Sequence, residues 1–189
     1  LSGVSGAILA AALLAGCAAA NRTVEEKTAG WSPNRLYSEA REESSSGGYD
    51  RAVQLYSVLE GRAAGTTLAQ QAQIDKAYAQ YLNGDNDEAV ATLDRFIRLN
   101  PASPALDYAY YLKGVANFNG AVGWLSFLTK QDLVERDQRA AKDSFNAFKE
   151  LITRFPDSRY VVDARRRMIY IANAMSESEV AIATYYYKQ

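Results

Sequence analysis

The residues that most often perform covalent chemistry in proteins are almost absent from this sequence. There is no histidine and a single cysteine, Cys17, so a serine or cysteine nucleophile would lack the usual general base. No glycine-rich phosphate-binding loop occurs. Asp85-Asn86-Asp87 has the acidic start of a calcium-binding loop, but Val90 stands where that loop needs glycine. We therefore expect no enzyme, no metal site and no cofactor other than a covalent lipid.

The single cysteine is placed for lipid attachment. It ends the run Leu14-Ala15-Gly16-Cys17, which matches the lipobox where a peptidase cuts before a cysteine that carries diacylglycerol. The apolar run 6–16 has the length of a signal-peptide core and is too short to span a bilayer. The alternative, a buried cysteine in an apolar helix, fits poorly with the change to polar residues at Asn21-Arg22. The sequence thus predicts a signal peptide over 1–16 and a protein that is anchored through Cys17.

The residues on either side of this motif extend the prediction. Ala18 follows the cysteine where an inner-membrane lipoprotein commonly carries aspartate, which implies sorting to the outer membrane. Residues 17–33 are small, polar and charged, so we expect a flexible lipidated tether there. The chain begins with Leu1, and we expect further residues of the signal peptide before it.

The stretch from Gly84 to Pro101 predicts the element on which the rest of the fold is built. Asp87 and Glu88 favour the start of a helix, and Pro101 follows its end. In tetratricopeptide repeats, small residues occupy positions 8 and 20, a large apolar residue position 24 and proline position 32. All four repeat positions are matched in this stretch and the residues before it, by Ala77, Ala89, Leu93 and Pro101. The helix also carries one apolar stripe, formed by Ala89, Val90, Leu93, Phe96 and Ile97.

The same numbering of repeat positions identifies one repeat unit before this one and one after it. The unit before it places Ala40, Ala52 and Tyr56 at positions 8, 20 and 24. In the unit after it, Gly114 and Phe148 are separated by more residues than the repeat pattern allows. This predicts an insertion over about 120–137 that either binds a partner or caps its own repeat. Its apolar residues are Trp124, Leu125, Phe127 and Leu128.

The predicted fold class is therefore all-α. Residues 34–189 should form a tetratricopeptide-repeat superhelix of antiparallel helix pairs, with the insertion between the helices of the third repeat. We expect a further helix from about Ser158 to Ala174, another from near Glu177, and more repeats after Gln189.

Several of these segments together resemble one protein family. The chain is similar to the BamD (ComL-type) lipoproteins of the β-barrel assembly machinery over residues 14–189. The resemblance rests on the lipobox, Arg95-Phe96-Ile97-Arg98-Leu99-Asn100-Pro101, Pro104, Asp107-Tyr108-Ala109-Tyr110-Tyr111, Gly114, Glu135-Arg136-Asp137, Phe155-Pro156-Asp157-Ser158-Arg159-Tyr160 and the segment 180–186. The first unit departs from the family, which usually has Tyr-Pro or Phe-Pro near 62–64 where this chain has Arg62-Ala63-Ala64.

The resemblance implies a lipid-anchored adaptor on the periplasmic face of the outer membrane of a Gram-negative bacterium. Such proteins bind the central barrel subunit, largely through their C-terminal repeats, and join the other lipoproteins of the complex. They also recognise the C-terminal strand of unfolded outer-membrane proteins, which commonly ends in an aromatic residue. The alternative is another tetratricopeptide lipoprotein that acts as a scaffold in cell-wall synthesis or division. A formal net charge of -1 argues against nucleic acid as a partner.

The candidate binding residues lie on the first helix of each unit. Positions 2, 5, 9 and 12 line the groove of tetratricopeptide arrays, and tyrosine there suits an extended amphipathic peptide. Packing between helices is the alternative for these rings. Arg95 and Arg98 either face an acidic partner or neutralise the end of their helix. The groove positions are Asn34, Tyr37, Arg41, Ser44, Gln71, Ile74, Tyr78, Tyr81, Tyr108, Tyr111, Val115 and Phe118.

Overall fold

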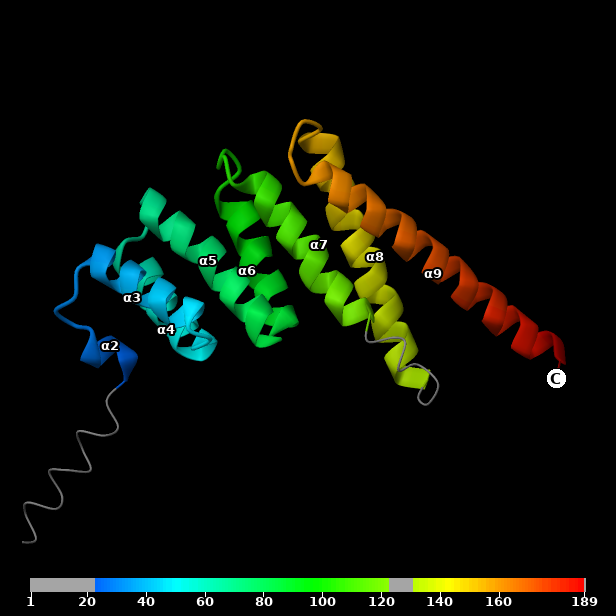
Figure 1. Cartoon of the computed structure of the whole chain (residues 1–189), viewed down its shortest axis with the longest axis horizontal. Helices are drawn as coiled ribbons and strands as arrows, with labels where there is room; N and C mark the ends of the chain where they lie inside the picture. The colour runs from blue at the N-terminus through cyan, green and yellow to red at the C-terminus, as the bar shows by residue number, and fades with distance from the viewer. Residues whose placement is uncertain (1–22, 123–130, 189) are drawn as a thin grey trace, which may run out of the picture.

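The described part of the chain folds as a row of helices. The computed structural model describes residues 23–122 and 131–188, and every regular element in those ranges is an α-helix. From α3 onward each helix packs against the next, and α5 also touches α3 and α7, so the helices follow one another along the long axis of the molecule (Figure 1). This is the predicted tetratricopeptide-repeat superhelix. The helices are α2 (Val24–Lys27), α3 (Pro33–Ser45), α4 (Tyr49–Arg62), α5 (Thr67–Asn83), α6 (Asn86–Leu99), α7 (Leu106–Val122), α8 (Gln131–Arg154) and α9 (Val161–Lys188).

Local sequence explains where these helices begin and end. The Thr66 side chain accepts a hydrogen bond from the amide of Ala69 and so caps the start of α5. Gly84 ends α5 with a φ of 87°, a left-handed conformation that glycine adopts without steric cost. The next helix, α6, carries Asp87 and Glu88 in its first turn, as predicted. The turn between the two helices is therefore encoded by a few neighbouring residues.

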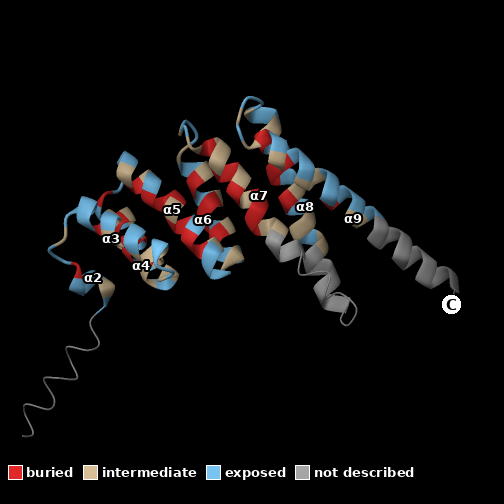
Figure 2. Cartoon of the chain, in the orientation of Figure 1, coloured by how far each residue is buried: buried red, intermediate tan, exposed pale blue. Residues whose placement is uncertain are grey.

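Small residues bring the helices of each pair into contact. Ala40, Ala52, Ala77 and Ala89, at repeat positions 8 and 20, are all fully buried. Gly114 takes this role in the third pair, where an added Cβ would lie 2.4 Å from Cε1 of Phe148. Figure 2 shows buried residues on each of the helices α3 to α8. They form three core clusters that follow one another along the row, and each depends on close backbone approach between helices.

The third pair of helices takes up much of the predicted insertion. α7 continues to Val122 and α8 begins at Gln131, so residues 120–122 and 131–137 belong to these two helices rather than to a separate element. The Ser144 hydroxyl donates to the carbonyl of Gly114 at 2.7 Å and fixes the register of the pair. Trp124, Leu125, Phe127 and Leu128 lie outside the described residues, so a binding or capping role for them stays a prediction.

The helix that follows is longer than predicted. We expected one helix to Ala174 and a second from near Glu177, but α9 is a single helix from Val161 to Lys188. The sequence between these residues has no glycine or proline to interrupt the backbone hydrogen bonds. Ser176, which lies between the two expected helices, donates its hydroxyl to the carbonyl of Ala172 within the single helix.

Residues 23–32, which we expected to be flexible, instead pack against α4. Thr23 and Glu26 form a capping box that starts the short helix α2. The Arg62 guanidinium reaches back from the end of α4 and donates to the carbonyl oxygens of Thr28 at 2.6 Å and Glu25 at 3.1 Å. We call residues 23–32 together with Arg62 the N-terminal clasp. The expectation of a flexible tether was wrong for residues 23–32, because Arg62 binds the carbonyl oxygens of Glu25 and Thr28.

Candidate functional site

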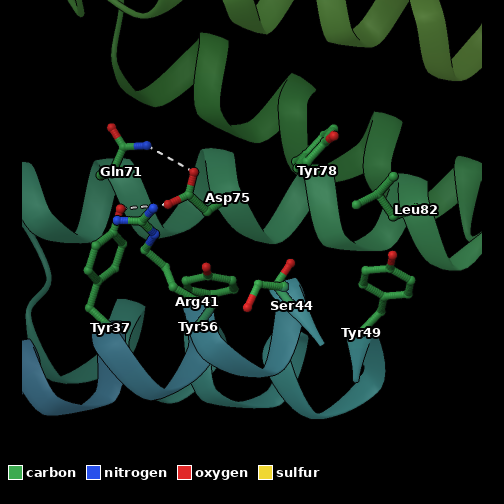
Figure 3. A pocket seen from close by; sticks show the side chains of 10 residues that line it. Tyr37, Arg41, Ser44, Tyr49, Tyr56, Gln71, Asp75, Tyr78 and Leu82 are labelled. Carbon is green, nitrogen blue, oxygen red and sulfur yellow. Dashed lines mark hydrogen bonds between the residues drawn. The ribbon is translucent and has the colours of Figure 1, made fainter. Parts of the chain in front are cut away.

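An open groove of about 760 Å³ runs between α3 and α5, with two residues of α4 in its wall (Figure 3). Its lining mixes aromatic rings with charged and hydroxyl-bearing side chains. α3 and α5 are the first helices of adjacent repeats, which is where the sequence predicts a binding surface. The lining residues are Tyr37, Arg41, Ser44, Ser45, Tyr49, Tyr56, Gln71, Asp75, Tyr78 and Leu82.

At one end of the groove a carboxylate is held by neutral donors. The hydroxyl of Tyr37 donates to Asp75 Oδ2 at 2.7 Å, and the amide of Gln71 donates to Asp75 Oδ1 at 2.9 Å (Figure 3). Burial, followed by this hydrogen bond to Asp75, raises the pKa of Tyr37 to about 12, so the phenol stays protonated and keeps donating. Each carboxylate oxygen therefore already accepts one hydrogen bond within the protein.

A cation lies beside that carboxylate. The guanidinium carbon of Arg41 is 6.0 Å from the centre of the Tyr37 ring, and its positive charge partly offsets the effects that raise the Tyr37 pKa. Arg41 is exposed, and it has no hydrogen bond or ion pair with any residue in the described part of the chain. Its five N–H donors face the groove without a protein acceptor (Figure 3).

The other end of the groove is apolar. Tyr49 at the start of α4 faces Leu82 near the end of α5, with Tyr78 one helical turn before Leu82 (Figure 3). Tyr78 and Leu82 are 41% and 38% exposed, which is high for large apolar side chains in a concave surface. The Tyr78 ring stacks on Tyr81 at a centroid distance of 6.3 Å, which limits its rotation. This end can therefore receive an apolar side chain without a large rearrangement.

The prediction for the second repeat selected a helix face that is slightly rotated from the observed one. Tyr37 and Tyr78 line the groove as predicted, but Ile74 is only 3% exposed and belongs to the core. Tyr81 packs against two core clusters instead of facing the groove. The observed lining of α5 follows the helical spacing i, i+4, i+7 and i+11, which replaces Ile74 and Tyr81 by Asp75 and Leu82. A strict 3.6-residue period would have found both of these residues.

The predicted groove residues of α7 make contacts of the kind expected from packing between helices. The Tyr111 ring stacks on Tyr160 at 4.6 Å, and its hydroxyl donates to Asp163 of α9 at 2.8 Å. Tyr108 also contacts Tyr160, with ring centres 5.5 Å apart. Phe118 meets the edge of Tyr170 at 5.6 Å, and Val115 is buried. These contacts link α7 to Tyr160 and to α9, and a groove role for these residues stays a prediction.

The two arginines predicted to face a partner have different surroundings. Arg95 forms an ion pair with Glu60 of α4, and Glu60 also pairs with Lys76 of α5 at 2.8 Å. The Glu60 carboxylate therefore joins the three helices α4, α5 and α6. Arg98 is exposed and has no ion pair within residues 23–118 and 138–176, for which side chains are described. Arg95 is also exposed, but its guanidinium is engaged by Glu60, so the two side chains do not act as a unit.

Buried tyrosines make the repeat array sensitive to alkali. Burial raises the pKa of Tyr56 and of Tyr108 above the usual phenol value, as it does for Tyr37. Because the folded pKa lies above that of the unfolded chain, this contribution to stability is complete below about pH 10 and is lost as the pH rises further. We expect the urea midpoint to fall between about pH 9 and about pH 11.

The variant Tyr56→Phe isolates this effect, because it removes one titrating group and keeps the ring. Its urea midpoint is expected to fall less than that of the unmodified protein over the same pH range. Equal decreases for the two proteins would contradict the assignment of the alkaline loss to this phenol. Tyr49→Phe, which makes the same change at a half-buried position at the start of α4, serves as the matched control.

Comparison with known proteins places the chain in a family. A family model described as outer membrane lipoprotein (YfiO) matches residues 30–189. The outer membrane protein assembly factor BamD of Neisseria meningitidis MC58 is 44% identical over 162 residues, 86% of this chain and 61% of that protein. The factor of the same name from Vibrio cholerae is 33% identical over 182 residues, 96% of this chain and 74% of that protein. The one from Haemophilus influenzae is 30% identical over 179 residues.

The match covers the whole row of described repeats, and the chain spans 61% of the length of its Neisseria relatives. Among the described residues, no helix combines the length and the apolar character needed to cross a bilayer, and no group of three carboxylate or sulfur side chains could hold a metal ion. The chain belongs to the YfiO family of outer membrane lipoproteins, together with the assembly factors named BamD.

Proposed function

We propose that this chain is part of a periplasmic adaptor that helps to assemble β-barrel proteins in the outer membrane. A lipid on Cys17 holds the repeat array to the periplasmic face of that membrane. Binding of the central barrel subunit and of the other lipoproteins of the complex uses the repeats, and no catalytic step is involved. Family membership and the names of the relatives, outer membrane protein assembly factors, support this proposal.

The groove between α3 and α5 carries the substrate-binding part of the proposal. It is open along its length, and its tyrosines present apolar rings with polar tips. A peptide that adopts an extended conformation places alternate side chains on one face and presents its backbone N–H and C=O groups along its edges. The apolar end of the groove suits such side chains, and the polar end suits backbone or terminal groups. The ligand that fits best is the C-terminal segment of an unfolded outer-membrane protein.

A photo-crosslinking amino acid at Tyr78 tests the proposal in cells that make the full-length lipidated protein. Tyr78 faces the groove and is 41% exposed, so the crosslinker should replace it without loss of folding. We expect adducts with newly made outer-membrane barrel proteins. The matched control carries the crosslinker at Leu99 of α6, which is 64% exposed and does not line the groove, and should give no such adducts.

Two results would oppose the proposal. Adducts from Tyr78 that contain only cell-wall or division proteins would favour the alternative scaffold function. Equal yields of barrel adducts from Tyr78 and Leu99 would show that contact with these proteins does not depend on the groove.

A further inference from the structure

We infer that Arg41 binds the free C-terminal carboxylate of the peptide in the groove, and that Tyr78 and Leu82 receive its last apolar side chains. This inference rests on the proposed function, because it assigns residues to the same groove. It names a specificity-determining residue and the ligand group that this residue recognises.

Arg41 is the one cation among the residues that line the groove, and its donors have no acceptor within the described residues. Its guanidinium presents a planar fork of donors that matches a carboxylate. Asp75, the anion of the lining, already accepts one hydrogen bond on each oxygen, from Tyr37 and from Gln71. A ligand that brings a carboxylate therefore gains bonds to Arg41 that no described group of the protein already makes.

The spacing along α5 fits an extended peptide that ends at Arg41. Tyr37 links the two charged groups, because the guanidinium carbon of Arg41 lies 6.0 Å from its ring centre and its hydroxyl donates to Asp75, so the position of Asp75 marks the level of the carboxylate. At about 1.5 Å per residue, Tyr78 lies roughly 4.5 Å and Leu82 roughly 10.5 Å further along the helix. In an extended peptide the side chains on one face repeat about every 6.6 Å. The terminal side chain therefore reaches Tyr78, and the side chain two residues earlier reaches Leu82.

Asp75 opposes the carboxylate and so contributes to selectivity. Its negative charge lies beside the site, and Arg41 must compensate for it when a second carboxylate binds. Tyr37 and Gln71 hold Asp75 in place and keep its oxygens turned toward α3 and along α5. We therefore expect removal of the Asp75 charge to tighten the binding of a peptide acid. The opposite reading, in which Asp75 receives a cationic group, predicts the opposite sign for each charge variant.

The test measures fluorescence anisotropy of short labelled peptides with alternating apolar residues that end in phenylalanine. The full-length lipoprotein is used in detergent, and each peptide is made as a free acid and as a C-terminal amide. We expect the acid to bind about tenfold more tightly than the amide, the usual effect of one charge-assisted contact. Arg41→Gln should remove this difference, Arg41→Lys should keep part of it, and Asp75→Asn should tighten the acid.

The control is Arg98→Gln, which removes an exposed arginine outside the groove and should leave both affinities unchanged. Equal affinities of acid and amide in the unmodified protein would overturn the inference. So would full acid affinity in Arg41→Gln. An amidated peptide with an internal glutamate that binds as tightly as the free acid would assign Arg41 to a side-chain carboxylate instead and would also overturn it.

Failure of this inference can be distinguished from failure of the proposed function. Leu82→Asp places a charge at the apolar end of the groove and should weaken acid and amide peptides alike. If it does so while Arg41→Gln has no effect, the groove binds peptides without reading the carboxylate. If Leu82→Asp has no effect on either peptide, peptide binding does not involve the groove.

Discussion

Replacement of Phe96 by alanine is expected to lower the free energy of unfolding by about 3–5 kcal/mol. The Phe96 side chain is fully buried in a cluster with Leu93, Ile74 and Leu112, which joins α5, α6 and α7. Removal of the ring costs its transfer free energy and leaves a cavity where three helices meet. Urea denaturation followed by far-ultraviolet circular dichroism measures the loss.

Leu99→Ala is the matched control for this experiment. It lies on the same helix, α6, but the leucine is 64% exposed. A surface truncation of this kind should change stability by no more than about 0.5 kcal/mol. Similar losses in the two variants would show that the cluster around Phe96 does not hold the repeats together.

Gly114→Ala is expected to destabilise the protein by about 1–3 kcal/mol, although alanine is the better helix former. A Cβ at this position would lie 2.4 to 2.7 Å from three ring atoms of Phe148. Phe148 is fully buried, so its ring has no free space into which to turn. The helices α7 and α8 would have to move apart, and contacts along both would weaken. Urea denaturation gives the change in free energy.

Gly61→Ala makes the same substitution where no atom lies within 4 Å of the new Cβ. Gly61 is exposed in the last turn of α4, so its replacement should stabilise the protein by up to about 1 kcal/mol. Opposite signs at the two glycines would confirm the close approach of α7 and α8. The double variant Gly114→Ala, Phe148→Leu should lose less than the sum of the single variants. A purely additive loss would contradict the steric explanation.

The repeat pattern could be predicted because it depends on neighbouring residues. Gly84 and the acidic start of α6 mark a turn within a few positions, and the small residues Ala77 and Ala89 mark where two helices touch. The clasp could not be predicted in this way. It depends on contacts between Arg62 and residues more than 30 positions earlier, and the pattern around Arg62 does not indicate them.

The length of α9 was mispredicted for a different reason. The two expected helices were separated at about Ala174 to Glu177, although no glycine or proline interrupts the chain there. The serine at 176 satisfies its hydroxyl within the helix, so it imposes no break.

The residue types of the candidate site could be predicted better than their roles. The repeat positions identified Tyr37, Arg41 and Tyr78 as groove residues, and all three line it. Asp75 was missed because the positions for α5 followed a slightly shorter period than the helix has. The sequence also could not show that Asp75 has two donors while Arg41 has no acceptor, because this depends on how α3 and α5 face each other.

The N-terminal clasp sets how far the repeats can lie from a lipid anchor. Arg62 fixes Glu25 and Thr28 to the end of α4, so the chain is attached to the first repeat from Thr23 onward. Only five residues then separate Thr23 from Cys17, and an extended chain across these six steps reaches at most roughly 20 Å. On the lipid-anchor proposal, the first repeat and its groove stay close to the lipid head groups. A barrel precursor would then be captured beside the surface into which it must insert, at a high local concentration of the groove.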